Sequence, residues 1–161
     1  MWDVDGNRYI DYVMGLGPNL FGHGPNFIKD AVNKGMSKGF IYSGQHELEN
    51  TVVEQALKFI PMQDSTVRFA SSGTENVQLA IRLIRSYTGK NKFINFEGHY
   101  HGWADNVFFS VNPKLNSSGS NMSPIAVPDS SSIYINIIEH ILLCQCNDIE
   151  NINYLFKKYK G

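Results

Sequence analysis

Apolar residues recur at helical spacing in two central stretches of the chain, residues 47–60 and 74–88. The repeating apolar positions are Leu48, Val52, Val53, Ala56, Leu57 and Ile60 in the first stretch, and Val77, Ile81, Ile84 and Tyr87 in the second. This period places apolar side chains on one face of a helix. Pro61 ends the first helix and Gly89 the second. The pattern therefore predicts two amphipathic helices.

Short runs of β-branched and aromatic residues follow each of these helices, at 66–70 and 92–96. The order helix, strand, helix, strand requires a crossover connection, which is typical of a parallel sheet. A further strand is predicted within 141–146. A last helix is predicted over 147–159, with Asn147 or Asp148 as its cap. The fold class is therefore α/β, with a mostly parallel sheet.

The N-terminal part of the chain has a different pattern. A turn at 5–7 precedes strand-like residues 8–13, and glycines and prolines then punctuate the chain up to a short helix that begins near Phe27. We expect residues 1–45 to form a short β/α segment and residues 46–161 to belong to the α/β domain. Within that domain, the serine-rich residues 116–132 predict a long surface loop.

Composition excludes several classes of protein. The 161 residues are 42% hydrophobic and 12% aromatic, and this aromatic content argues against a disordered chain. The formal net charge of −1 favours neither nucleic acid nor a membrane surface as a partner. Two cysteines cannot build a disulfide framework. The start has no signal-peptide pattern and no stretch approaches the length of a membrane span, so the expected location is the cytoplasm.

The turn at 71–75 is the first candidate binding site. A predicted strand runs into small residues that open a helix, an arrangement that directs backbone N–H groups and the positive helix end at one point. Gly73 allows an anion to approach the backbone, and the Ser72 and Thr74 hydroxyls add donors. Ser72 and Glu75 also have the spacing of a capping box. A plain helix cap and a phosphate site are compatible interpretations.

Residues 96–102 form the second candidate, just beyond a predicted strand end. Ligands of parallel sheets gather at the carboxyl ends of strands, so this segment and the serine turn are expected to face one crevice. Tyr100 offers a flat ring for stacking. His99 and His101 have no cysteine or carboxylate cluster beside them, so we expect turn hydrogen bonding rather than a metal site.

These motifs resemble the class III aminotransferases, a pyridoxal 5'-phosphate-dependent family of fold type I. Within that family, the likeness points to the glutamate-1-semialdehyde 2,1-aminomutase branch. The resemblance rests on residues 3–12, 21–25, 47–49, 67–75, 80–89 and 96–102 with Asp105, and more weakly on 128–130 and 146–159. The matching pieces keep the family's order and spacing.

The resemblance implies specific roles for five residues. Ser72, Gly73 and Thr74 would hold the phosphate of pyridoxal phosphate, Tyr100 would cover one face of its pyridine ring, and His101 would sit beside that ring. The implied reaction moves an amino group between small amino and oxo acids through a Schiff base. The family works as a homodimer, and its large domain would be only partly represented here.

The resemblance also implies that this chain is an N-terminal portion of such an enzyme and is inactive alone. The family's Schiff-base lysine lies downstream of the last matching motif, and none of the lysines here stands in its context. We therefore predict no catalytic residue in the chain. The alternatives are a non-catalytic remnant or accessory chain that keeps a cofactor crevice, and a generic anion-binding domain. Residues 41–46 depart from the branch's pattern, which leaves the substrate open.

Overall fold

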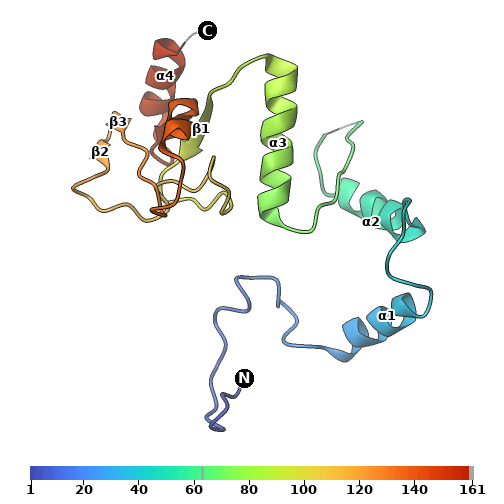
Figure 1. The fold of residues 1–161 in the computed structure, drawn as a ribbon. Coiled ribbons are helices and arrows are strands. Elements are labelled where there is room, and N and C mark those ends of the chain that lie inside the picture. Colours follow the sequence, from blue (N-terminus) through green and yellow to red (C-terminus); the bar gives the residue numbers. More distant parts are fainter. Residues whose placement is uncertain (63, 160–161) are drawn as a thin grey trace. The chain divides into compact units, whose positions relative to one another are not determined.

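The computed structural model describes residues 1–62 and 64–159. The chain divides into two compact units, Met1–Thr66 and Val67–Gly161. The first unit holds helices α1 (Asn26–Met36) and α2 (Glu47–Leu57), which follow an irregular N-terminal stretch (Figure 1). Of the strand-like residues 8–13, Arg8 forms an antiparallel bridge with Trp2, and Tyr9 exchanges backbone hydrogen bonds with Met1 across the predicted turn. The described structure shows no strand longer than this bridge there, so the pairing is shorter than expected.

Helix α2 starts where its pattern predicts and ends one turn early. The His46 ring accepts a hydrogen bond from the Leu48 N–H at 3.2 Å and so caps the helix. Its last helical residue is Leu57, whereas the apolar period runs to Ile60. Residues 58–60 continue in tighter turns, in which each N–H donates to the carbonyl three residues earlier. Pro61 disfavours helical backbone angles at Ile60, so the α-helix does not extend to the proline.

The second unit is α/β, as predicted. In chain order it contains α3 (Gly73–Thr88), β1 (Phe93–Phe96), β2 (Gly119–Ser120), β3 (Ser123–Pro124), the 3-10 helix η1 (Ile135–His140), β4 (Ile141–Cys144) and α4 (Ile149–Lys158) (Figure 1). Strands β1 and β4 pair in parallel, with Phe93 opposite Ile141 and Phe96 opposite Cys144. The short pair β2–β3 is antiparallel and lies inside the segment expected to be loop.

The strand predicted at residues 66–70 is wrong. The stretch is irregular in the described structure, and no described strand pairs with it. A strand is stable only when its N–H and C=O groups pair with a neighbour, so strand-like composition alone does not make one. The parallel connection that the pattern predicted exists instead between β1 and β4.

A small core lies beside this strand pair. Phe109, Ala126 and Ile141 are buried together, and the partly buried residues packed against them are Phe93, Ile133, Ile137 and Ile138. Helix α4 is fixed by polar contacts at its start. Asp148 caps it by accepting from the Asn151 N–H at 2.8 Å, and the fully buried Asn151 side chain donates to the Met122 carbonyl at 2.8 Å.

Helix α3 exposes the C-terminal half of its apolar face. Gly89 ends it in a left-handed conformation, as predicted. None of its residues is buried, and Leu83, Ile84 and Tyr87 are exposed by 60%, 57% and 92%.

Among the helices that the structure describes, none is long and apolar enough to cross a membrane.

Candidate functional site

The N-terminus of α3 has the geometry of a capped helix start. Ser72 is the N-cap, and its Oγ accepts a hydrogen bond from the Glu75 N–H at 3.2 Å. The same hydroxyl lies 3.3 Å from Glu75 Oε2. The helix-cap interpretation is therefore confirmed. The cap satisfies only one of the free amides of the first turn, because no described residue accepts from the Gly73 or Thr74 N–H.

Gly73 leaves the space in front of this turn open. A Cβ atom placed on Gly73 would meet no heavy atom within 4 Å. The two unpaired N–H groups and the positive end of a 16-residue helix therefore face an accessible region. That combination attracts an anion.

The segment after β1 is held by backbone hydrogen bonds. The Glu97 N–H donates to the Cys144 carbonyl at 2.9 Å, which extends the β1–β4 ladder by one residue. The Gly98 N–H then donates to the Ser110 carbonyl at 2.8 Å. Residues 98–110 thus form a loop that starts just beyond the end of β1 and is closed there by the Gly98–Ser110 hydrogen bond.

This loop reaches the start of α3 at Gly102. A Cβ atom on Gly102 would lie 2.9 Å from Thr74 Oγ1 and 3.1 Å from Thr74 Cα. Gly102 is buried and has a φ of +109°, a backbone angle that favours glycine. The structure therefore brings together the two segments that the sequence singled out, although the serine turn does not follow a paired strand.

Replacing Gly102 with alanine is expected to lower the free energy of unfolding by about 2–4 kcal/mol, since the new methyl group adds backbone strain to a clash with Thr74. Gly98→Ala is the matched control. Gly98 also has a positive φ, +78°, but a Cβ there meets nothing within 4 Å. Strain alone predicts a loss of about 1 kcal/mol for this control. Urea denaturation of both variants gives the comparison, and equal losses would contradict the close contact.

Tyr100 and His101 lie on this loop, next to Gly102. Tyr100 is 61% exposed, and its ring meets the Phe108 ring edge-on at a centroid distance of 6.1 Å. One ring surface is therefore available to a flat ligand. His101 is half-buried, and its Nε2 atom is buried without a hydrogen-bond partner among the described residues. Within the described ranges, no group of three His, Cys, Asp or Glu side chains is arranged to hold a metal ion.

Burial lowers the pKa of His101 below its ordinary value of 6.5, and the nearby His99 lowers it further, against an opposing contribution from the Phe96 backbone. The unfolded ring takes up its proton near pH 6.5, whereas the folded ring does so only at a lower pH. The unfolded chain therefore binds more protons in this window, so stability falls as the pH drops below about 6.5.

We expect His101→Gln to flatten the dependence of the melting temperature on pH between about 5.5 and 7.5. The exposed His140 provides the matched control, because His140→Gln removes a histidine far along the chain. Thermal unfolding at several pH values measures the slope. A slope that is unchanged in His101→Gln and reduced in His140→Gln would contradict the assignment.

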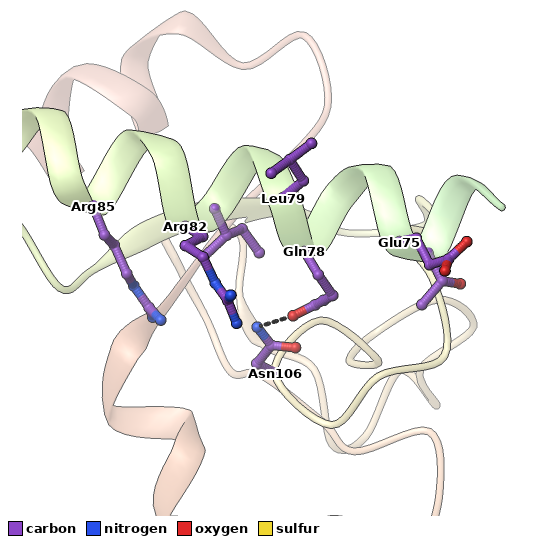
Figure 2. A pocket seen from close by; sticks show the side chains of 8 residues that line it. Glu75, Gln78, Leu79, Arg82, Arg85 and Asn106 are labelled. Carbon is purple, nitrogen blue, oxygen red and sulfur yellow. Dashed lines mark hydrogen bonds between the residues drawn. The ribbon is translucent and has the colours of Figure 1, made fainter. Parts of the chain in front are cut away.

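A cavity of about 650 Å³ adjoins the turn, along one side of α3 (Figure 2). Thr74 lines it at the start of the helix, Gln78 and Arg82 follow, and Asn106 lies opposite. The Asn106 Nδ2 group donates to Gln78 Oε1 at 2.9 Å. No sequence motif points to this amide pair. Two amides separated by 28 positions form no periodic pattern and no recognised motif.

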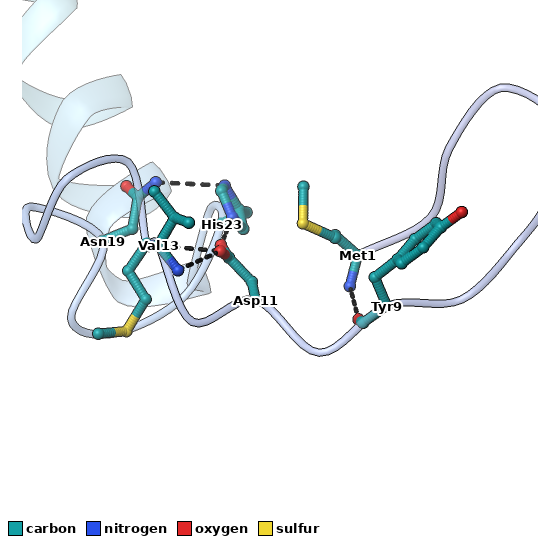
Figure 3. Close-up of polar contacts among 7 residues, drawn as sticks. Met1, Tyr9, Asp11, Val13, Asn19 and His23 are labelled. Atoms are coloured by element: carbon teal, nitrogen blue, oxygen red, sulfur yellow. Dashed lines mark hydrogen bonds and ion pairs between the residues drawn. The ribbon is translucent and has the colours of Figure 1, made fainter.

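A second polar cluster lies in the N-terminal unit (Figure 3). The Asp11 carboxylate contacts His23 Nε2 at 2.6 Å and accepts from the Val13 and Met14 N–H groups at 3.0 and 2.9 Å. Asn19 Nδ2 lies 3.3 Å from the other ring nitrogen of His23. The Met14 N–H first, and His23 second, hold the pKa of Asp11 below its ordinary value. These contacts close the glycine-rich loop on itself.

Comparison with known proteins gives consistent results. A model of the family described as aminotransferase class-III matches residues 1–154. The glutamate-1-semialdehyde 2,1-aminomutase of Francisella philomiragia is 38% identical over the whole of this chain. Among solved structures, an omega-transaminase from Sphaerobacter thermophilus superimposes with a TM-score of 0.90 at 28% identity, over 99% of this chain and 36% of its own. A transaminase with bound PLP superimposes with a TM-score of 0.83 at 24% identity, over 98% and 35%.

The coverage is strongly one-sided. The chain spans 35% of the Francisella aminomutase and a similar share of both solved structures. About two thirds of each of these longer proteins therefore has no counterpart in the 161 residues of this sequence.

Proposed function

Because the chain belongs to the class III aminotransferases, we propose that it forms the N-terminal, cofactor-binding portion of a pyridoxal 5'-phosphate (PLP)-dependent aminotransferase or aminomutase. The substrate class is a small amino or oxo acid, and glutamate-1-semialdehyde is the first candidate because of the named relative. The observation that carries the proposal is the contact between Thr74 and Gly102. It joins the phosphate turn, residues 72–74, to the aromatic shelf, which is the exposed ring face of Tyr100 on the loop that also carries His101.

The residues present fit the chemical groups of PLP. Its phosphate dianion suits the unpaired Gly73 and Thr74 N–H groups and the open space in front of Gly73. Its flat pyridine ring suits the exposed face of Tyr100. Its polar ring substituents suit the unpartnered Nε2 atom of His101, which needs a hydrogen-bond partner when buried.

Each residue then has a defined task. When bound, PLP supplies the electron sink on which amino-group transfer depends. The start of α3 anchors the phosphate through Gly73 and Thr74, while Ser72 keeps the first turn wound by capping it. Tyr100 orients the ring by contact with one face. His101 stays neutral near pH 7, because burial lowers its pKa, and it adds no net charge to the site. None of these residues acts as the nucleophile.

Ligand binding to the full chain tests the proposal. Equilibrium dialysis is carried out with PLP, with pyridoxal, which lacks the phosphate, and with inorganic phosphate. We expect PLP to bind at least about tenfold more tightly than either, because only PLP engages both the turn and the aromatic shelf. Equal affinities for PLP and pyridoxal would refute a phosphate site at the turn. Equal affinities for PLP and phosphate would refute the proposal that Tyr100 and His101 bind the pyridine ring.

A second candidate is an accessory chain that binds the cofactor but does not transaminate. In the described residues, the proposed cofactor contacts come from a helix start and one loop, which suffices for binding alone. The two candidates make the same prediction for PLP binding. They differ in the result expected when the missing part of the enzyme is supplied.

A further inference from the structure

We propose that Gln78 and Asn106 are positioning residues for the cofactor site, which fix the distance between the phosphate turn and the aromatic shelf. This inference rests on the proposed PLP function. The pair belongs to none of the motifs that carried the family resemblance. It consists of one hydrogen bond, at 2.9 Å, between a side chain on α3 and a side chain on the loop that carries Tyr100 and His101.

The turn and the shelf belong to parts of the fold that are otherwise loosely joined. Helix α3 has no buried residue, and the close packing among helices and strands of this unit involves β1, β2, β3, β4, η1 and α4. At its far end, α3 is tied by Arg85, which donates through Nε and Nη2 to the Asn91 carbonyl at 3.1 and 3.0 Å. At its near end, the described contacts with the loop are the approach of Gly102 to Thr74 and the Gln78–Asn106 bond.

The two near-end contacts restrain α3 in different ways. Gly102 and Thr74 meet through van der Waals contact, which sets how closely the loop approaches but leaves sliding along the helix free. The Gln78–Asn106 bond lies one helical turn further on and has a preferred direction. Together they fix both the separation and the register of the loop. Figure 2 shows the two amides in direct contact at the lining of the cavity beside α3.

Both amide groups are at least partly shielded from water, which strengthens the restraint. Gln78 and Asn106 are half-buried, and Gln78 Nε2 is buried without a described partner. A hydrogen bond in such a setting meets less competition from water than a surface one. The bond to Asn106 is the described hydrogen bond of the Gln78 amide, so its loss would leave both ends of that amide without a described partner.

The consequence concerns ligands that touch both parts of the site. PLP must contact the turn through its phosphate and the shelf through its ring, so its affinity depends on their separation being set in advance. Inorganic phosphate touches the turn alone, and the turn is built locally by the Ser72–Glu75 cap. Loss of the amide pair should therefore weaken PLP selectively.

The test compares the dissociation constants of PLP and phosphate in the full chain and its variants. In Gln78→Met, which removes the acceptor at similar volume, we expect PLP to bind about three- to tenfold more weakly while phosphate changes by less than about twofold. Gln78→Glu keeps an acceptor for Asn106 but adds a charge that weakens both ligands together, so the ratio of the two constants should stay near its original value. Asn76→Met is the matched control, at an exposed position of the same helix.

Two further measurements make every outcome decisive. Combining Gln78→Met with Asn106→Leu should add no further loss of PLP affinity if the two residues act as one pair. In the absence of ligand, the nuclear Overhauser contact between the Thr74 methyl group and the Gly102 α-protons should persist in Gln78→Glu and weaken in Gln78→Met. Contacts between β1 and β4, followed in the same spectra, show whether each variant folds.

The possible failures are distinguishable. Parallel weakening of PLP and phosphate, additive effects of the two substitutions, or an equal loss in Asn76→Met would overturn the positioning role while leaving PLP binding intact. If the original chain binds PLP no better than phosphate, the proposed function fails. In that case, the nuclear Overhauser contact between Thr74 and Gly102 in the ligand-free protein is the remaining test of the positioning role. Its persistence in Gln78→Met would overturn that role.

Discussion

Replacing Thr74 with aspartate is expected to raise the dissociation constant of PLP by about 100-fold or more. The new carboxylate would stand in the first turn of α3, next to the N–H groups proposed to hold the phosphate. Two unit charges about 5 Å apart repel by roughly 3 kcal/mol at an effective dielectric constant of about 20, which corresponds to that change in affinity. Absorbance titration with PLP measures it.

This substitution separates binding from folding. An acidic residue in the first turn of a helix interacts favourably with the helix dipole, typically by about 0.3–1 kcal/mol. We therefore expect the melting temperature of Thr74→Asp to stay close to the original. Thr74→Ser keeps the hydroxyl and should change PLP affinity by less than about threefold. Asn76→Asp adds the same charge at an exposed position of the same turn, as a control for general repulsion. Undiminished PLP binding by Thr74→Asp would show that the phosphate site is wrongly placed.

The helices could be predicted from sequence because their determinants are local. The apolar period placed α2, α3 and α4, and the end signals at Ser72, Gly89 and Asp148 act as expected. Each of these signals acts within one turn of the residue that carries it. The strand prediction for residues 66–70 was wrong for the opposite reason. Their strand-like composition is local, but the partner that would make them a strand is not.

The same distinction applies to the site. The Ser72 cap follows from four consecutive residues, and the structure confirms it. The meeting of Thr74 and Gly102 depends on how residues 98–110 close on themselves, which no local pattern encodes. The strand-end rule predicted their proximity, although one of the two strands it invoked is absent. The Gln78–Asn106 pair lay beyond sequence reasoning altogether, because neither residue type signals a long-range contact.

The exposed apolar side chains of α3 suggest that this chain needs a further polypeptide segment to be active. Leu83, Ile84 and Tyr87 are exposed, and within the described residues the parallel sheet consists of the two strands β1 and β4. A sheet this small is marginal by itself, and exposed apolar side chains of this size are normally covered. The relatives are about three times longer, and we propose that their remaining residues supply this cover together with the Schiff-base lysine.

We therefore expect the chain alone to show no amino transfer above background. Co-expression with the portion of the Francisella philomiragia aminomutase that lies beyond its match to this chain should give a complex that consumes glutamate-1-semialdehyde when PLP is added. Gain from background to measurable turnover is the largest change predicted for this protein. The assay follows loss of the semialdehyde with the chain, with the relative's portion, and with both.

Thr74→Asp within the same complex supplies the internal control. The substitution lies at the proposed phosphate turn and not on the exposed Leu83, Ile84 and Tyr87 side chains, so the complex should still assemble but remain inactive. Turnover by the unassisted chain would contradict the need for a second polypeptide. A complex that assembles, binds PLP and still fails to consume the semialdehyde would favour the accessory-chain alternative, or a substrate other than the semialdehyde. Amino transfer from a panel of amino donors, beginning with glutamate, then separates those two explanations. A complex with an accessory chain should transfer an amino group from none of the donors.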